Sequence, residues 1–568
     1  MMLPMLNERE QQRDGQNEFG GYRNRLSAGP MEFREMLNMS ADEAPMLAPR
    51  KRRRKIRTIS GGKTLLGGST LSWVENGTLF YGGKAVAQGV SADAQLVRMG
   101  AYLIAWPDKL IYNTFTGELS QMDNKWIGNG VHVRPCMLGG QDLDYVAGDE
   151  EPENPRDQMY WLNTAVNAMY QYLGGVWTGI DTVYSRLESM DIGKNFKDYD
   201  VVTISGMDDD DFNIQGATIY ARGDDYIVIA TGEIVDFEND GDVTIARKAP
   251  ALDRICENGN RLWGYSNQTH EIRCTKLGDP WNWNSYLGIS LDSYAATVGS
   301  QGDFTGIYNY MGYVHFFKEN RVHRLYGTQP SNFQLVELQM RGVKPGCEES
   351  LCVVDEMLYY MSRDGIMRYD GSSPVDMSEP LGDVRMEAVV CGAHEHKLYV
   401  SAITDGEPVL YALDTARLLW HREDGARAVA FAGTTEGDFF LDDKGTLWSI
   451  DGARSALEAH DAADEEELPF MAVSGDMLTE TTRGKLLKRI EIRLAMERGA
   501  HVNLDVQYNS DGRWHRVLAY ETETKRTVTL PIIARRCDHM ALRISGKGRV
   551  VVFNLTKIFE VTEARRNA

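Results

Sequence analysis

The chain has 568 residues, 42% of them hydrophobic and 25% charged, with a formal net charge of −21 at pH 7. The length predicts two to four domains, and the composition is that of a globular protein with enough apolar side chains for a large core. The negative charge excludes a body that wraps around DNA, because such a body would repel the phosphates. No stretch approaches about 18 consecutive apolar residues, so no membrane-spanning helix is predicted.

Residues 1–57 differ from the rest and are predicted to form an N-terminal arm. They hold twelve Lys or Arg and eight Asp or Glu, so the negative excess lies elsewhere. We expect one short helix and then an extended segment, because Pro45 and Pro49 exclude a continuous helix. The arm ends in a basic run, its candidate interaction site: Arg50, Lys51, Arg52, Arg53, Arg54, Lys55 and Arg57. The favoured partner is an acidic protein surface, of this chain or of a second subunit. DNA phosphates and a solvated tail are the alternatives.

From residue 58 onward, short apolar runs alternate with turn residues. Asn76-Gly77 is a strong hairpin signal, and Pro107-Asp108-Lys109 marks the turn of a second hairpin. Five more hairpins follow residue 250, with apolar centres 40 to 52 residues apart: Leu262, Val314, Leu358, Leu398 and Phe440. This spacing is typical of β-propeller blades. We therefore predict a propeller of six to eight blades in residues 58–132 and 251–455.

Two further regions lack the blade period. Residues 133–250 contain short strands with polar turns, such as "DYDVVTISG" and "YIVIAT", and predict an inserted small β-barrel. Residues 467–568 alternate apolar and polar residues and turn at Ser510-Asp511-Gly512, which predicts a C-terminal β-sandwich. The predicted fold class is all-β, with the N-terminal arm preceding the propeller, the inserted barrel and the sandwich.

No catalytic, cofactor or metal-binding constellation is recognisable. "GGKT" at residues 61–64 lacks the first glycine of a phosphate-binding loop, and residues 208–211 lack the spacing of a calcium loop. His394 and His396 could bind a metal from one strand, but no third ligand is evident, and a polar blade edge is favoured. The seven cysteines are scattered and form no CxxC pair, so we expect reduced thiols. We expect no catalytic residue, no cofactor, no metal and no enzymatic activity.

Three segments in order carry a resemblance to a known family. They are "NRLWGYSNQTHEIRCTKLGDPWNW" at 260–283, "VHFFKENRVHRLYG" at 314–327, and the unit at 346–366 that contains "LYYMSRDGI". Together with the start "EMLNMSADEAPMLAPRKRRR", they resemble propeller-bearing virion proteins of tailed bacteriophages, of the tail-nozzle or packaged-DNA stabilisation type. The resemblance covers about residues 20–370 and the terminal sandwich, and no active-site residue carries over from it.

The resemblance implies a structural protein of the virion tail, assembled in the host cytoplasm. It would form a ring of six copies that continues the DNA channel below the portal or adaptor and helps to retain and eject the genome. Its partners would be its own copies, the portal or adaptor, other tail proteins and DNA in transit, without sequence readout. An acidic wall suits such a duct. The alternative is a receptor- or glycan-binding propeller at the tail tip, for which 11 Trp and 26 Tyr could supply stacking platforms. A third hypothesis is a hydrolase with a propeller fold.

Overall fold

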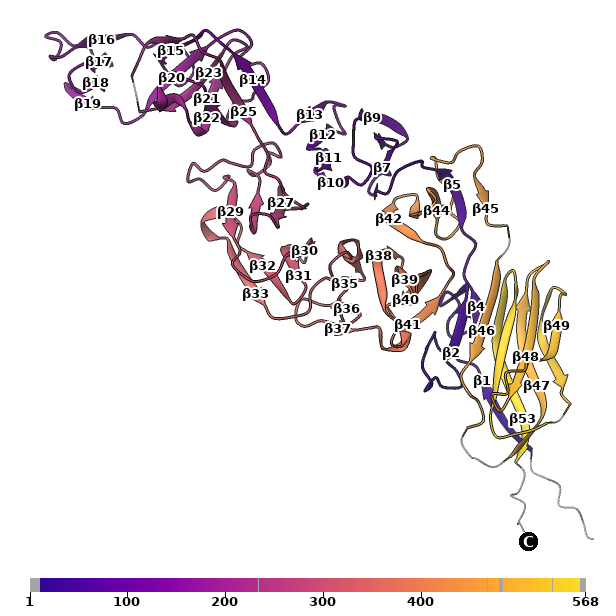
Figure 1. The fold of residues 1–568 in the computed structure, drawn as a ribbon. Coiled ribbons are helices and arrows are strands. Elements are labelled where there is room, and N and C mark those ends of the chain that lie inside the picture. Colours follow the sequence, from indigo (N-terminus) through magenta and orange to yellow (C-terminus); the bar gives the residue numbers. More distant parts are fainter. Residues whose placement is uncertain (1–10, 233, 467, 480–483, 534, 562–568) are drawn as a thin grey trace, which may run out of the picture. The chain divides into compact units, whose positions relative to one another are not determined.

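The computed structural model describes residues 11–232, 234–466, 468–479, 484–533 and 535–561 (Figure 1). The predicted all-β fold class is confirmed: these residues form strands and short 3-10 helices, and no α-helix occurs among them. No helix in this part of the chain is long and apolar enough to cross a membrane. The 3-10 helices are η1 (Asp210–Phe212), η2 (Pro330–Asn332), η3 (Glu348–Ser350) and η4 (Glu379–Leu381). The chain divides into two compact units, the first made of Met1–Asp93, Phe317–Val322 and Glu337–Ala568 and the second of Ala94–Phe316 and His323–Val336.

The propeller blades are seven sheets among the described residues, within the expected range of six to eight. In six of them four strands pair in chain order, and in the seventh the fourth strand is β5 from the predicted arm, next to β44. The first three are β6 to β9 (Leu65–Leu66, Ser72–Glu75, Thr78–Tyr81, Lys84–Gln88), β10 to β13 (Gln95–Met99, Tyr102–Trp106, Leu110–Asn113, Leu119–Gln121) and β26 to β29 (Arg254–Asn258, Arg261–Ser266, Glu271–Cys274, Tyr294–Thr297). The others are β30 to β33 (Phe304–Tyr310, Tyr313–Lys318, Arg321–Tyr326, Gln334–Leu338), β34 to β37 (Cys352–Val354, Met357–Met361, Ile366–Tyr369, Val375–Asp376), β38 to β41 (Met386–His394, Lys397–Thr404, Glu407–Asp414, Leu419–Arg422), and β42 to β44 with β5 (Ala428–Thr434, Gly437–Asp442, Thr446–Ser449, Arg54–Thr58).

The predicted hairpin turns lie between paired strands. Asn76 and Gly77 connect β7 to β8 with φ angles of 49° and 74°, the left-handed conformation that a tight two-residue hairpin turn requires. Pro107-Asp108-Lys109 connects β11 to β12, and Asp405-Gly406 connects β39 to β40. Local turn chemistry therefore set the strand boundaries in these blades.

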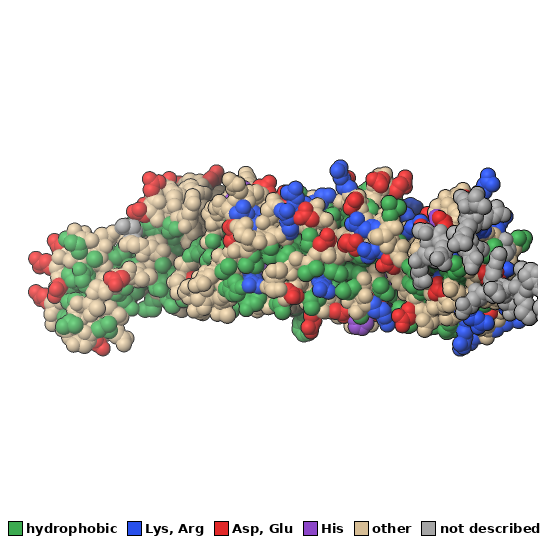
Figure 2. Space-filling view, turned by 90° about the horizontal axis from the view of Figure 1, so that it is seen from below, with side chains coloured by type: hydrophobic (Ala, Val, Ile, Leu, Met, Phe, Trp, Pro, Cys, Tyr) green, Lys and Arg blue, Asp and Glu red, His purple; other side chains and the backbone are tan. Residues whose placement is uncertain are grey.

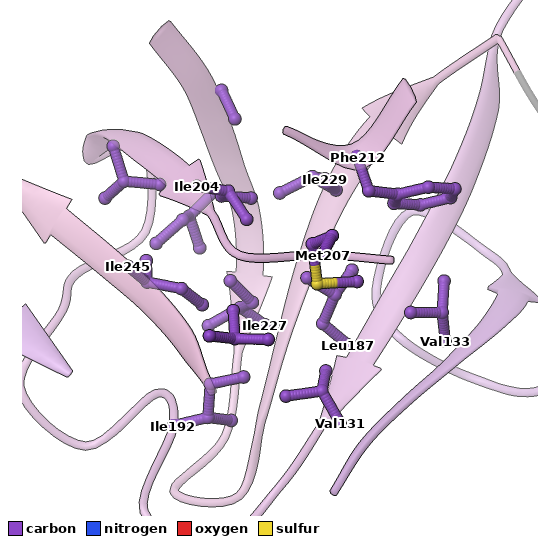
Figure 3. Close-up of a cluster of buried hydrophobic side chains, with 14 of the residues drawn as sticks. Val131, Val133, Leu187, Ile192, Ile204, Met207, Phe212, Ile227, Ile229 and Ile245 are labelled. Atoms are coloured by element: carbon purple, nitrogen blue, oxygen red, sulfur yellow. The ribbon is translucent and has the colours of Figure 1, made fainter. Parts of the chain in front are cut away.

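The main body of the insert is an eight-stranded sheet, in the order β14-β25-β21-β22-β23-β20-β15-β24, that encloses one apolar core (Figure 3). Val133, Ile204, Phe212, Ile229 and Ile245 come from different elements and meet in this core. The barrel begins earlier than the predicted boundary at residue 133, because β14 pairs with β25 along its whole length. The strands are β14 (Asn124–Gly128), β15 (Val131–Cys136), β20 (Val183–Glu188), β21 (Val201–Ser205), β22 (Gln215–Arg222), β23 (Tyr226–Thr231), β24 (Phe237–Asn239) and β25 (Val243–Arg247).

The C-terminal sandwich consists of two five-stranded sheets, and each receives one strand from the predicted arm. One sheet is β1-β53-β47-β50 with β51 on β47, and the other is β2-β46-β52-β48-β49. The strands are β1 (Gln11–Gln16), β2 (Phe33–Leu37), β46 (Pro469–Ser474), β47 (Lys485–Met496), β48 (His501–Tyr508), β49 (His515–Tyr520), β50 (Thr524–Pro531), β51 (Arg536–Cys537), β52 (Met540–Lys547) and β53 (Val550–Val561).

The prediction of a short helix in the N-terminal arm is wrong. Residues 33–37 form β2, and two short strands, β3 (Met39–Ser40) and β4 (Ala48–Pro49), pair with each other. Pairing of β1 with β53 and of β2 with β46 gives the backbone groups of this segment hydrogen-bond partners in an existing sheet, whereas a short helix without tertiary packing is only marginally stable. The segment is thus part of the sandwich.

The arm also completes the last blade. Strand β5 pairs with β44, and β45 (Ala463–Asp464) pairs with the other edge of β5. The first and last blades in chain order are joined, since the Gly68 amide donates to the Gly433 carbonyl at 2.9 Å. Ile56, Trp73 and Leu441 belong to one buried cluster at this junction. Residues far apart in the sequence therefore stabilise the same blade.

Candidate ligand-binding face

The basic run of the arm contacts acidic residues of the same chain. Arg53 is buried and donates from Nη2 to Glu423 Oε2 at 2.7 Å and from Nη1 to Asp424 Oδ2 at 2.8 Å. Arg50 is also buried, and its Nη1 donates to Glu465 Oε2 at 2.8 Å. Burial would raise the pKa of Asp424, but the charges of Arg53 and Arg50 outweigh it and hold that pKa below its ordinary value. The site is a buried ionic cluster.

The remaining members of the run lie closer to solvent. Arg54 donates to Glu458 at 2.8 Å and to Asp464 at 2.7 Å, and Lys55 donates to Asp461 at 2.7 Å. The Arg57 guanidinium lies over the Trp73 ring, 4.9 Å from its centroid. Lys51 and Arg52 are exposed. In this structure the run therefore binds the chain's own surface through five of its seven members.

The other polar motifs have local structural partners. His394 Nδ1 lies 2.8 Å from Asp438 Oδ2, whereas His396 Nδ1 lies 2.8 Å from Asp355 Oδ1, so the two rings point to different carboxylates. In the acidic turn at 208–211, Asp209 caps η1. Among the residues that the structure describes, no group of three His, Cys, Asp or Glu side chains is placed to hold a metal ion. The seven cysteines are all free.

A small sheet within the insert has two very different faces. It consists of β16 (Tyr145–Gly148), β17 (Tyr160–Asn163), β18 (Ala168–Leu173) and β19 (Val176–Gly179), in that order. One face contributes Leu162 and Met169, which pair across β17 and β18 and pack with Val183 and Ile234. This face is the one by which the small sheet is buried.

The opposite face carries a row of aromatic side chains, here called the aromatic face: Trp161, Tyr170, Tyr172 and Trp177. Trp161 lies opposite Tyr170 in the register, and Tyr172 lies opposite Trp177. Ring centroids are 5.2 Å apart for Trp161 and Tyr170, 5.4 Å for Trp161 and Trp177, and 5.1 Å for Tyr172 and Trp177. The four rings therefore form one continuous aromatic surface.

Trp161 forms the base of this surface and the other rings form its outer part. Only 4% of Trp161 is exposed, and its Nε1 donates to the Gly148 carbonyl at 3.1 Å. Tyr170, Tyr172 and Trp177 are partly exposed, and Val146, opposite Trp161, is 44% exposed. A fixed indole under partly exposed rings is a preorganised contact surface, because little side-chain freedom remains to be lost on binding.

Sequence reasoning missed this face because residues 154–179 combine weak helical spacing with residues typical of strands, and no strand was assigned within them. The signal for strands was present in "YQYLGGVW", where Tyr170 and Tyr172 alternate with other residues before Gly174-Gly175. These glycines have φ angles of 57° and 94°, the left-handed conformation of a tight hairpin turn. Alternation and turn together place Tyr172 and Trp177 side by side.

A hollow of about 540 Å³ lies between the loop that joins β28 to β29 and residues 329–331, at the start of η2. Tyr286 lines it and is 56% exposed. Buried Arg261 and Asp292 hold its loop: Arg261 Nη2 donates to the Ser290 carbonyl at 2.9 Å, and Asp292 Oδ2 accepts from the Ile289 amide at 2.9 Å. This hollow is the rival site to the aromatic face.

Comparison with protein-family models gives no match for this chain, and comparison with curated proteins gives none either. Solved structures do match. An exo-β-1,3-galactanase from Phanerochaete chrysosporium with galactose is 9% identical, with a TM-score of 0.21, over 53% of this chain and 95% of its own. Hsv2 from Kluyveromyces lactis is 8% identical, with a TM-score of 0.26, over 62% of this chain and 95% of its own. A bifunctional GH43-CE protein from Bacteroides eggerthii is 10% identical, with a TM-score of 0.20, over 56% of this chain and 64% of its own.

These matches contradict two predictions from the sequence. The prediction of a bacteriophage tail ring is corrected, because the matched structures named here are glycoside hydrolases and Hsv2 rather than virion proteins. The expectation that the chain is not an enzyme is withdrawn, because the matched structures include glycoside hydrolases. Identities of 8% to 10% and TM-scores of 0.20 to 0.26 assign no activity to this chain.

The motifs behind the bacteriophage resemblance have a structural explanation. Trp263 and Trp283, in the segment 260–283, are buried in blade cores, and Arg261 holds the loop described above. Any propeller needs such packing between neighbouring sheets. These residues therefore stabilise the blades.

Proposed function

We propose that this chain is a glycan-binding β-propeller protein and that the aromatic face on β16 to β19 contacts the sugar. The observation that supports this is the row of four adjoining rings on the sheet face opposite to the packed one. Aromatic rings offer large apolar area at small entropic cost, while Tyr O–H and Trp N–H groups can still bond to hydroxyls. The C–H faces of sugar rings suit such a surface.

Size and position support the same function. A row of rings on a sheet can contact several sugar units of an extended oligosaccharide, because side chains on one strand face repeat every second residue. Tyr170 and Tyr172 have this spacing on β18, and Trp177 continues the row on β19. The packed face of the small sheet contacts Val183 of the barrel strand β20, so the aromatic face lies on the side away from this contact.

The test is binding of the full chain to an array of oligosaccharides, followed by calorimetry on the best ligand. Trp177→Ala should weaken binding about tenfold or more, since stacking contacts contribute roughly 1 to 3 kcal/mol and 1.4 kcal/mol is tenfold. Trp177→Phe should retain most of the affinity. Phe115→Ala is the matched control, because this aromatic residue is 90% exposed and lies in the turn between β12 and β13.

Two results would overturn the proposal. One is an array on which the wild-type chain binds no oligosaccharide. The other is a ligand whose affinity falls with Tyr286→Ala but is the same for Trp177→Ala and wild type, because binding would then take place in the rival hollow.

A further inference from the structure

The loop that joins β16 to β17 carries an uncompensated negative charge. Between residues 149 and 157 the chain has one basic side chain, Arg156, and five acidic ones: Asp149, Glu150, Glu151, Glu153 and Asp157. All of these side chains are exposed. With five acidic side chains and one basic one, the loop has a formal net charge of −4. Their charge therefore acts on whatever approaches from solvent.

Both ends of this loop are tied to the aromatic face. At its start, Gly148 accepts the hydrogen bond from Trp161 Nε1 at 3.1 Å, and Asp149 follows directly. At its end, Asp157 Oδ1 accepts a hydrogen bond from the Gly174 amide at 3.2 Å, in the turn between Tyr172 and Trp177. Figure 2 shows acidic side chains beside apolar ones at its left end, where Figure 1 places β16 to β19. A ligand on the rings thus lies in the field of these carboxylates.

We infer that the aromatic face selects glycans bearing protonated amino groups over neutral glycans, and excludes anionic ones. The inference rests on the proposed function of this face. An ammonium group is attracted both by the negative faces of aromatic rings and by nearby carboxylates. A uronate or sulfate on the sugar meets like charges instead, which is the usual way in which a surface rejects a wrong partner.

The experiment compares three oligosaccharides of equal length by calorimetry with the full chain. The probes are a β-1,4-linked N-acetylglucosamine hexamer, its fully deacetylated form at pH 6, and a hexagalacturonate. We expect at least tenfold tighter binding of the deacetylated hexamer than of the acetylated one at 20 mM NaCl, and no binding of the hexagalacturonate. The preference should shrink at 500 mM NaCl, because the screening length falls below about 10 Å above 0.1 M salt.

Two charge variants locate the effect. Glu150→Gln/Glu151→Gln/Glu153→Gln should reduce the preference to less than threefold and leave the affinity for the acetylated hexamer unchanged. The matched control, Asp208→Asn/Asp210→Asn/Asp211→Asn, removes the same charge from another exposed turn of the insert and should keep the preference. A control variant that loses it as well would overturn the inference, because the net charge and not the loop would then be responsible.

The outcomes separate this inference from the proposed function. Equal affinity for the acetylated and deacetylated hexamers, both weakened by Trp177→Ala, would overturn the charge selectivity and leave glycan binding in place. Absence of binding to all three hexamers and to the array would overturn both. Binding of hexalysine as tight as that of the deacetylated hexamer, and insensitive to Trp177→Ala, would overturn the inference in favour of a basic protein partner.

Discussion

Replacement of Arg53 by methionine should destabilise the first unit strongly. Arg53 has 5% of its side chain exposed and Glu423 has 1%, and the two are joined at 2.7 Å. Without the guanidinium, the Glu423 carboxylate stays buried, and the cation that still faces it among the described residues is Arg50, whose Nε lies 3.6 Å away. Removal of one partner from a buried ion pair costs about 3 to 5 kcal/mol. Methionine keeps the length of the side chain, so the loss measures the charge and its hydrogen bonds.

The assay is urea unfolding followed by tryptophan fluorescence and far-ultraviolet circular dichroism. Arg52→Met is the matched control, because Arg52 is exposed in the same run, and its effect should stay within about 0.5 kcal/mol. Arg53→Met/Glu423→Leu should regain part of the lost free energy, since no buried charge is then left unpaired. If Arg53→Met costs no more than Arg52→Met, the cluster does not hold the arm and the reasoning fails.

Three further predictions follow from other contacts. The pKa of Asp424 lies below its ordinary 3.8, so its ionised carboxylate stabilises the fold above that pH, and this stabilisation is lost as the pH falls through the lower pKa of the folded state. The urea concentration at the unfolding midpoint should therefore decrease when the pH is lowered below about 4, and it should decrease less in Asp424→Asn. Gly67→Ala should cost about 2 kcal/mol or more in urea unfolding, because its Cβ would lie 1.9 Å from the Gly433 oxygen, whereas Gly299→Ala, with nothing within 4 Å, should cost far less. Iodoacetamide at pH 8 should label the native chain much more slowly than the unfolded one, since burial raises to about 12 the pKa values of Cys136, Cys274 and Cys352. Equal labelling rates would contradict the burial of these thiols.

Hairpins were predictable because their information is local. Asn76-Gly77 supplies the left-handed turn, and the flanking apolar residues supply both strands, so no distant residue was needed to place β7 and β8. The same holds for Asp405-Gly406 and for the repeated spacing that indicated blades. The limits of the insert were less accurate, because β14 becomes a barrel strand only by pairing with β25, more than a hundred residues away.

The candidate site was not predictable from motifs. The aromatic face depends on register, since a shift of one residue in β18 would turn Tyr170 and Tyr172 toward the packed side. Composition gave the number of Tyr and Trp residues but not which of them lie in blade cores. Trp263 and Trp283 are buried there, whereas Trp177 is not.

The sequence by itself determined an all-β chain with blade-like hairpins, an interrupting barrel and a terminal sandwich, because alternation and turn residues act over a few positions. Tertiary structure alone decided which sheets the strands of the N-terminal segment join. It added β1 and β2 to the sandwich and β5 to the last blade, and it brought Arg50 and Arg53 onto Glu423 and Asp424. Charge in the sequence indicates that a basic run needs a partner, but only the folded chain places particular carboxylates within reach of it.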